Sequence, residues 1–169
     1  MVNQYLKITD DSGFIAVVDP KKYNSFLSAD WSFEQLRERF IVEMNKQTLI
    51  IWSTGMEGEW NIELLEHASG KPAFREFEKL IEVTNEQLCF INYESLSMAA
   101  QFEDFRIASE QDHSLSSKIP NGKYTILVRQ LFNPMIYEDE QIENTHFEII
   151  FKQARVNAGK NIIDNILWL

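Results

Sequence analysis

The chain has 169 residues and a formal net charge of −10 at pH 7, with 44% hydrophobic and 25% charged residues. A chain of this length buries about two thirds of its unfolded surface as one folded unit, so it needs neither metal nor disulfide to fold. This composition is ordinary for a soluble globular protein and favours neither a disordered nor a fibrous protein. We therefore expect a single globular domain spanning residues 1–169.

The negative charge is unevenly distributed along the chain. Residues 57–148 carry eighteen acidic and seven basic side chains, whereas residues 1–56 carry seven and six, and residues 149–169 carry one and three. A segment with a net charge of −11 repels a phosphate backbone and attracts a basic protein. We therefore expect no nucleic-acid binding, and the plausible macromolecular partner is a basic protein.

Membrane contact and an intrachain disulfide are also not expected. No apolar run reaches the roughly 18 residues that span a bilayer, and the N-terminus MVNQYLKITDD lacks the regions of a signal peptide. The single cysteine, Cys89, lies in an apolar run and is predicted to be a small buried hydrophobe. The predicted location is the cytoplasm.

The first two strands are predicted at residues 5–9 and 14–18. Between them lies Asp10-Asp11-Ser12-Gly13, which supplies carboxylates that cap a turn and a glycine that tolerates positive φ. This arrangement predicts an opening β-hairpin.

A helix is predicted over about residues 33–46. Ser32 and Gln35 form a capping-box pattern, in which each side chain accepts from a free backbone N–H at the helix start. Apolar residues then recur at steps of three and four: Phe33, Leu36, Phe40 and Met44, with Ile41 beside them. The charged residues Glu34, Arg37, Glu38 and Glu43 are assigned to the other sides. This amphipathic helix is expected to pack on a sheet.

Two further hairpins are predicted in the middle of the chain. Residues 48–52 are continuously apolar and residues 59–65 alternate, with two glycines between the two runs. Trp52 and Trp60 are interpreted as core residues, although stacking on a sugar or base is the alternative. Residues 73–83 fit a helix or a strand, and we favour a strand from about Phe77 that pairs with residues 88–92. A break at 94–97 and a short strand at 98–102 are expected to follow.

The clearest strand lies at residues 124–132, and the turn Pro120-Asn121-Gly122 before it predicts a hairpin that feeds this strand. One parity, Tyr124, Ile126, Val128 and Gln130, is predicted to face the core. A last strand alternates at residues 147–152. The apolar tail, with Ile162, Ile166 and Trp168, is too short to be ordered alone and must dock as a short helix or strand, on this domain or across a homodimer.

These elements predict a mainly β protein. The many short strands, one helix at about 33–46 and no alternation of strand with helix favour an antiparallel β-sandwich. The sequence shows no phosphate loop or nucleophile motif, and the histidines His67, His113 and His146 are too isolated for metal-ligand spacing. We therefore expect no cofactor, no metal and no catalytic residues, although a chance pair of carboxylates is left open.

Two acidic segments are the candidate partner-binding residues. One contains Glu138, Asp139, Glu140 and Glu143, and the other contains Glu103 and Asp104, followed by Glu110 and Asp112. Each is either a solvated surface or a docking face for a basic protein. In the second case the charges accelerate association and make it sensitive to salt.

Part of the chain resembles competence protein J, the small inhibitor that accompanies a DNA-entry nuclease. The resemblance rests on residues 80–91, on Ile119-Pro120-Asn121-Gly122-Lys123-Tyr124, and on Asp30-Trp31-Ser32 before the helix. It implies a cytoplasmic β-sandwich that inhibits a nuclease, or an immunity protein that neutralises a toxin. This chain differs in its greater length, its acidic segment at 135–144 and its apolar tail, and the resemblance assigns no inhibitory residue.

Three functional hypotheses follow. The first is a non-catalytic acidic protein that occludes a basic nuclease or toxin. The alternative is a sandwich that binds a small ligand or carbohydrate in an aromatic pocket, as an enzyme if two carboxylates are paired. The third is self-association through the apolar tail.

Overall fold

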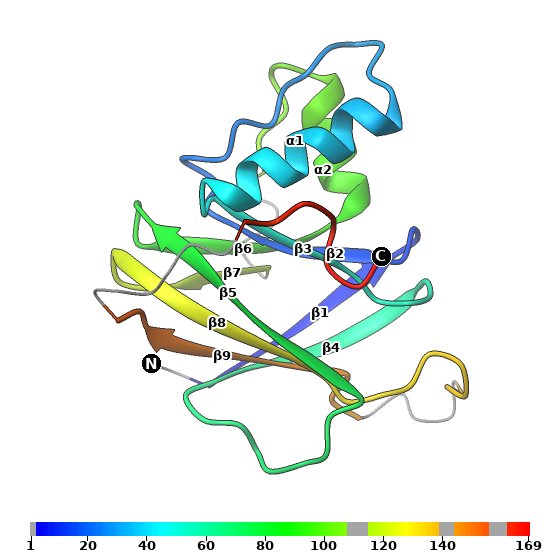
Figure 1. Ribbon diagram of the computed structural model, residues 1–169, viewed down its shortest axis with the longest axis vertical. Coiled ribbons are helices and arrows are strands. Elements are labelled where there is room, and N and C mark those ends of the chain that lie inside the picture. The colour runs from blue at the N-terminus through cyan, green and yellow to red at the C-terminus, as the bar shows by residue number, and fades with distance from the viewer. Residues whose placement is uncertain (1–2, 108–114, 139–143, 156–161) are drawn as a thin grey trace.

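The computed structural model describes residues 3–107, 115–138, 144–155 and 162–169, and it is mainly β (Figure 1). The five-stranded sheet has the order β1-β4-β9-β8-β5. Its strands are β1 (Gln4–Asp10), β4 (Gly58–Leu65), β5 (Arg75–Val83), β8 (Gly122–Gln130) and β9 (Phe147–Gln153). The four-stranded sheet has the order β3-β2-β6-β7. Its strands are β2 (Phe14–Val18), β3 (Leu49–Ser53), β6 (Gln87–Asn92) and β7 (Ser116–Lys118).

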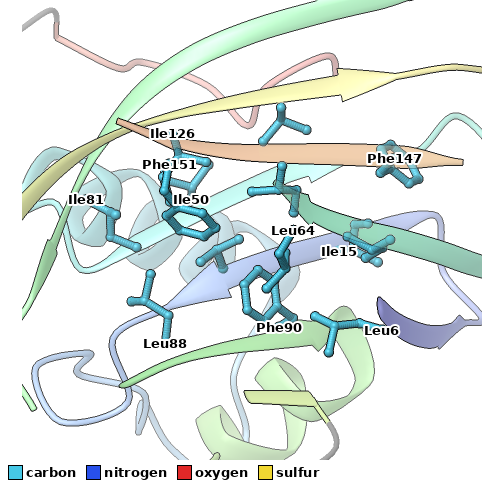
Figure 2. Packing of buried hydrophobic residues seen from close by; sticks show 14 of the residues in the cluster. Leu6, Ile15, Ile50, Leu64, Ile81, Leu88, Phe90, Ile126, Phe147 and Phe151 are labelled. Carbon is cyan, nitrogen blue, oxygen red and sulfur yellow. The ribbon is translucent and has the colours of Figure 1, made fainter. Parts of the chain in front are cut away.

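The two sheets and the helices α1 (Phe33–Asn45) and α2 (Tyr93–Gln101) form three layers (Figure 1). Apolar side chains from both sheets meet in the first core, where Ile50, Phe90 and Phe147 are buried (Figure 2). Both helices cover the outer face of the four-stranded sheet and close a second core with it. This sheet is buried on both faces, which explains why β2, β3 and β6 are continuously apolar in sequence while β8 alternates.

The three hairpins predicted from the first two thirds of the sequence are wrong. The turns β1–β2, β3–β4 and β5–β6 each cross from one sheet to the other, so the flanking strands do not pair. The hairpin predicted at residues 120–122 is wrong for the same reason, because β7 and β8 lie in different sheets. β1 pairs instead with β4, and β5 pairs with β8. A turn motif shows that the chain reverses direction, and alternation shows which side of a strand is buried. Neither property identifies the strand's hydrogen-bonding partner.

The sandwich is not wholly antiparallel. β4 and β9 pair in parallel, with Ile62 opposite Phe147 and Leu64 opposite Ile149. The other strand pairs of the described residues are antiparallel. A parallel pair requires a long crossover, and here 81 residues lie between Leu65 and Phe147. Such a distant pairing leaves no local signal in the sequence.

The short strand predicted at residues 98–102 is also wrong, because this stretch is the second half of α2. Asn92 caps the helix, and its side chain accepts a hydrogen bond from the Ser95 N–H at 2.9 Å. Leu96, Ala99 and Ala100 are buried at helical spacing against the four-stranded sheet. The described residues therefore contain a second helix in addition to the predicted one.

Helix α1 confirms the predicted helix and its capping box at Ser32 and Gln35. One assignment differs: Glu43, expected on a polar side, is fully buried. Its carboxylate accepts from the Thr48 hydroxyl at 2.5 Å and lies 3.2 Å from Lys46 Nζ. Neither helix of the described residues combines the length and apolar character needed to cross a membrane.

The predicted strand after Gly122 is confirmed, with Tyr124, Ile126, Val128 and Gln130 buried.

The apolar tail docks on its own chain, not as a helix but through a parallel bridge between Leu167 and Trp52. Ser53 N–H donates to the Leu167 carbonyl at 2.9 Å, and the Trp168 ring lies 4.2 Å from the Arg75 guanidinium. The tail therefore covers the free edge of β3.

Candidate functional site

A cleft of about 470 Å³ lies at the end of the sandwich where the β1–β2 and β3–β4 turns approach the segment after β8. We call it the acidic cleft. Its walls include four carboxylate residues and one cation, together with three ring side chains: Asp10, Asp11, Glu57, Glu59, Lys7, Trp60, Tyr137 and His146. A shallower hollow of about 530 Å³ adjoins it and shares Asp11 and Glu57. The two hollows form one acidic concave surface.

Asp10 holds this end of the sandwich together. It is 1% exposed, and its Oδ1 accepts from the backbone N–H groups of Ser12, Gly13 and Phe14 at 3.0, 2.7 and 3.1 Å. Its Oδ2 accepts from Trp60 Nε1 at 3.1 Å. The Asp-Asp-Ser-Gly turn therefore forms as its sequence predicts. The same carboxylate also joins the turn to Trp60 of β4, the strand that pairs with β1 in the five-stranded sheet.

The other acids of the cleft are exposed to solvent. Asp11, Glu57 and Glu59 come from two different turns, and only Glu59 of the three has an ion-pair partner among the described residues, Lys7 Nζ at 2.6 Å. Glu94, at the start of α2, accepts from the Ser12 hydroxyl and adds a further carboxylate beside the β1–β2 turn. Acidic side chains from three separate segments therefore converge at one end of the molecule.

The aromatic wall of the cleft is packed internally. Trp60 is fully buried and stacks on Phe132, with ring centroids 4.8 Å apart and an interplanar angle of 18°. Tyr137 and His146 contact the Trp60 ring edge-on. Trp52 is 1% exposed. The core interpretation of Trp52 and Trp60 is confirmed, and neither ring offers an open face on which a sugar or base could stack.

His146 is buried between β4 and Tyr137. Its Nδ1 accepts from the Asn61 N–H at 2.9 Å, and its Nε2 lies 2.9 Å from the Tyr137 hydroxyl. An accepting Nδ1 carries no proton, so the neutral ring is protonated at Nε2 and donates to Tyr137. Desolvation by burial lowers the pKa of His146 below its ordinary value. The ring is therefore a neutral structural link between β4 and the segment that carries Tyr137.

This burial makes the fold sensitive to mild acid. The unfolded chain protonates His146 near pH 6.5, whereas the folded chain resists protonation, so the unfolded state binds more protons and stability falls below about pH 6.5. We expect His146→Asn, which keeps an acceptor for Asn61 N–H, to reduce this loss between pH 7.5 and 5.5. Urea unfolding followed by tryptophan fluorescence measures it. His67→Asn, at an exposed position, is the control and should leave the pH dependence unchanged.

The acids selected from the sequence lie at two different ends. Glu138 is exposed and is the next residue in the chain after Tyr137, which lines the acidic cleft. Glu103 and Asp104 are exposed and follow directly after α2, the helix that with α1 forms the helical end of the molecule (Figure 1). The described residues exclude Asp139, Glu140, Glu143, Glu110 and Asp112.

Sequence reasoning missed the cleft acids Asp11, Glu57 and Glu59. Each lies in or beside a turn that is visible in the sequence, but only the crossing of these turns between sheets brings them together. Within the described residues, no three His, Cys, Asp or Glu side chains are placed so that they could hold one metal ion. Cys89 is buried, as predicted.

Comparison with known proteins identifies the fold. No family model matches the chain, and no curated protein matches it in sequence. The solved structure of crocagin biosynthetic gene J is similar over 92% of this chain and 100% of its own, with a TM-score of 0.60 and 16% identity. ComJ from Bacillus subtilis, described as an inhibitor of the DNA degrading activity of NucA, is similar over 91% of this chain and 96% of its own, with a TM-score of 0.51 and 14% identity. The chain has a ComJ-like fold.

Proposed function

We propose that this chain is a non-catalytic binding protein that inhibits a basic partner, such as a nuclease or toxin. In this proposal the acidic cleft binds the basic surface of the partner and blocks it. The observation that carries the proposal is the convergence of exposed carboxylates from separate turns at one end of the sandwich. The ComJ-like fold supports it, because ComJ is an inhibitor of a DNA-degrading enzyme. We also propose that the protein acts in the cytoplasm. A single buried cysteine outside any disulfide is compatible with that reducing compartment.

The charge arrangement suits inhibition of an enzyme that itself binds nucleic acid. Such an enzyme presents a basic surface to phosphates, and a concave acidic surface is complementary to it. Long-range attraction between the two raises the association rate and is screened by salt. The contact therefore needs no catalytic group on this chain.

Charge reversal at the acidic cleft tests the proposal. We expect Glu57→Lys combined with Glu138→Lys to slow association with the partner at least tenfold at about 50 mM salt and to flatten the salt dependence, because steering charges act mainly on the association rate. Both side chains are exposed, so the fold should be unaffected. Glu103→Lys combined with Asp104→Lys changes the net charge equally at the helical end and is the matched control.

The probes are two purified proteins. The first is NucA from Bacillus subtilis, and the second is the basic protein that the wild-type chain captures from its source lysate in about 50 mM salt and releases in about 500 mM salt. If the two double variants slowed association with the partner equally, the contact surface would not be the acidic cleft. Failure to bind NucA, together with failure to retain any stoichiometric basic protein, would reject the proposed function.

A further inference from the structure

We infer that Met135 and Ile136, which we call the apolar anchor, insert into an apolar pocket on the basic partner and govern how long the complex persists. The inference rests on the proposed function, in which the charges of the acidic cleft explain association. Those charged side chains supply little apolar contact with the partner. Steering charges at the rim of an interface alter the association rate, whereas buried side chains near its centre alter the dissociation rate.

The apolar anchor is unusually exposed for its chemistry. Met135 is 90% exposed and Ile136 is 77% exposed, and the two are adjacent on the segment that follows β8. Single exposed hydrophobic residues are common on protein surfaces. Here two adjacent large residues are both mostly exposed, and they directly precede Tyr137, which lines the acidic cleft. Such a pair is the arrangement that a partner would bury.

The structure holds the anchor in place by hydrogen bonds of its own turn. Asn133 Oδ1 accepts from the Met135 N–H at 3.0 Å, and the Asn133 carbonyl accepts from the Ile136 N–H at 3.2 Å. An asparagine that closes a turn in this way fixes the backbone of the residues after it. The anchor therefore projects from an ordered turn.

The residues on either side of the turn are fixed in the protein. Phe132, on one side, is 8% exposed and stacks on Trp60. Tyr137, on the other, lies 5.1 Å from the Phe132 ring and is hydrogen-bonded to His146 at 2.9 Å. Because the backbone is held at both ends, less conformational entropy is lost when a partner buries the anchor.

The residue before the anchor, Pro134, also packs against the β3–β4 turn. At Gly55, φ is +89°, and a Cβ there would lie 2.6 Å from Cγ of Pro134. The β3–β4 turn, which carries Glu57, thus packs directly on the residue that precedes Met135. This contact fixes the anchor relative to the carboxylates of the acidic cleft.

These features define the partner's surface by complementarity. The anchor is convex, so the partner must supply a concave apolar pocket. Glu138 follows the anchor two residues later in the chain, and Glu57 lies in the turn that packs on Pro134, so the rim of that pocket must be basic. A basic protein with an apolar depression inside its basic surface satisfies both requirements.

Dissociation kinetics test this inference with the two probes named above, NucA and the captured basic protein. We expect Met135→Ser combined with Ile136→Ser to raise the dissociation rate at least tenfold, with little change in the association rate or its salt dependence. Val42→Ser combined with Ile162→Ser removes apolar side chains that are 46% and 88% exposed on other parts of the chain. This control should leave both rates unchanged.

Each outcome distinguishes the anchor from the proposed function. If cleft charge reversal slows association but the anchor variant dissociates like the wild type, the anchor is rejected and the acidic inhibitor stands. If the anchor variant and the Val42 and Ile162 control raised the dissociation rate equally, any exposed apolar residue would contribute to the lifetime of the complex. That result would also reject the anchor. If neither probe binds the wild-type chain, both ideas are overturned.

Discussion

Arg129→Met is expected to lower the free energy of unfolding by about 3–5 kcal/mol, because it leaves a buried carboxylate without its cation. Arg129 Nη1 donates to Glu148 Oε2 at 2.6 Å, and Glu148 is fully buried. Arg129 Nη2 also donates to the Lys71 carbonyl at 2.6 Å. Burial acts to lower the pKa of Arg129, but the hydrogen bonds to Glu148 and Glu76 outweigh it and raise the pKa overall. The guanidinium therefore ties β8 and β9 to the segment that follows β4.

Urea unfolding at pH 7.5 measures this loss. Glu148→Gln in the Arg129→Met background removes the uncompensated charge and should restore at least half of it. The control is Lys152→Met, which breaks a pair 3.5 Å apart between side chains that are both about half exposed. That change should cost less than about 1 kcal/mol. An equally small effect of Arg129→Met would show that Glu148 is hydrated in the folded state.

Asp10→Ala is expected to destabilise the protein by about 3 kcal/mol or more. Each lost hydrogen bond to a buried carboxylate costs about 1.5–3 kcal/mol, and several N–H groups lose their acceptor at once. These donors are three consecutive backbone amides of the β1–β2 turn and the indole of Trp60. Asp10→Asn should be less harmful than Asp10→Ala, because its amide oxygen can still accept from the three backbone N–H groups of the turn, while its NH₂ group faces the Trp60 indole N–H.

The neighbouring residue provides the control for Asp10. Asp11 is exposed and lies in the same turn, so Asp11→Ala should change the free energy of unfolding by less than about 0.5 kcal/mol. Thermal and urea unfolding at neutral pH compare the two variants. Similar stability of Asp10→Ala and Asp11→Ala would show that the turns are held by their backbone alone, without the Asp10 carboxylate.

The sequence predicted local structure well where one signal dominated. The capping box at Ser32 and the three- and four-residue spacing of Leu36, Phe40 and Met44 identified α1. The alternation from Tyr124 to Gln130 identified β8 and its buried face. The second helix was missed because its cap at Asn92 directly follows an apolar strand and its buried residues include two alanines, which carry a weak periodic signal.

The candidate site was only partly predictable for a related reason. The sequence singled out Glu138 through its acidic neighbours, whereas Asp11 and Glu57 were assigned to separate hairpin turns. The exposure of Met135 and Ile136 also had no signature, because their burial depends on whether another segment covers them. A turn residue becomes part of a site only through the segments that the fold places beside it.

By itself, the sequence determined that this protein is mainly β, where its first helix begins, and which face of β8 lies in the core. These properties depend on the spacing of residues within one element, and spacing is read directly from the chain. Only the tertiary structure decided that short turns cross between the sheets, that β4 and β9 pair in parallel, and that the acids of three segments converge. Those outcomes depend on contacts between residues far apart in sequence, where the burial of shared apolar surface selects the partner and local propensity does not.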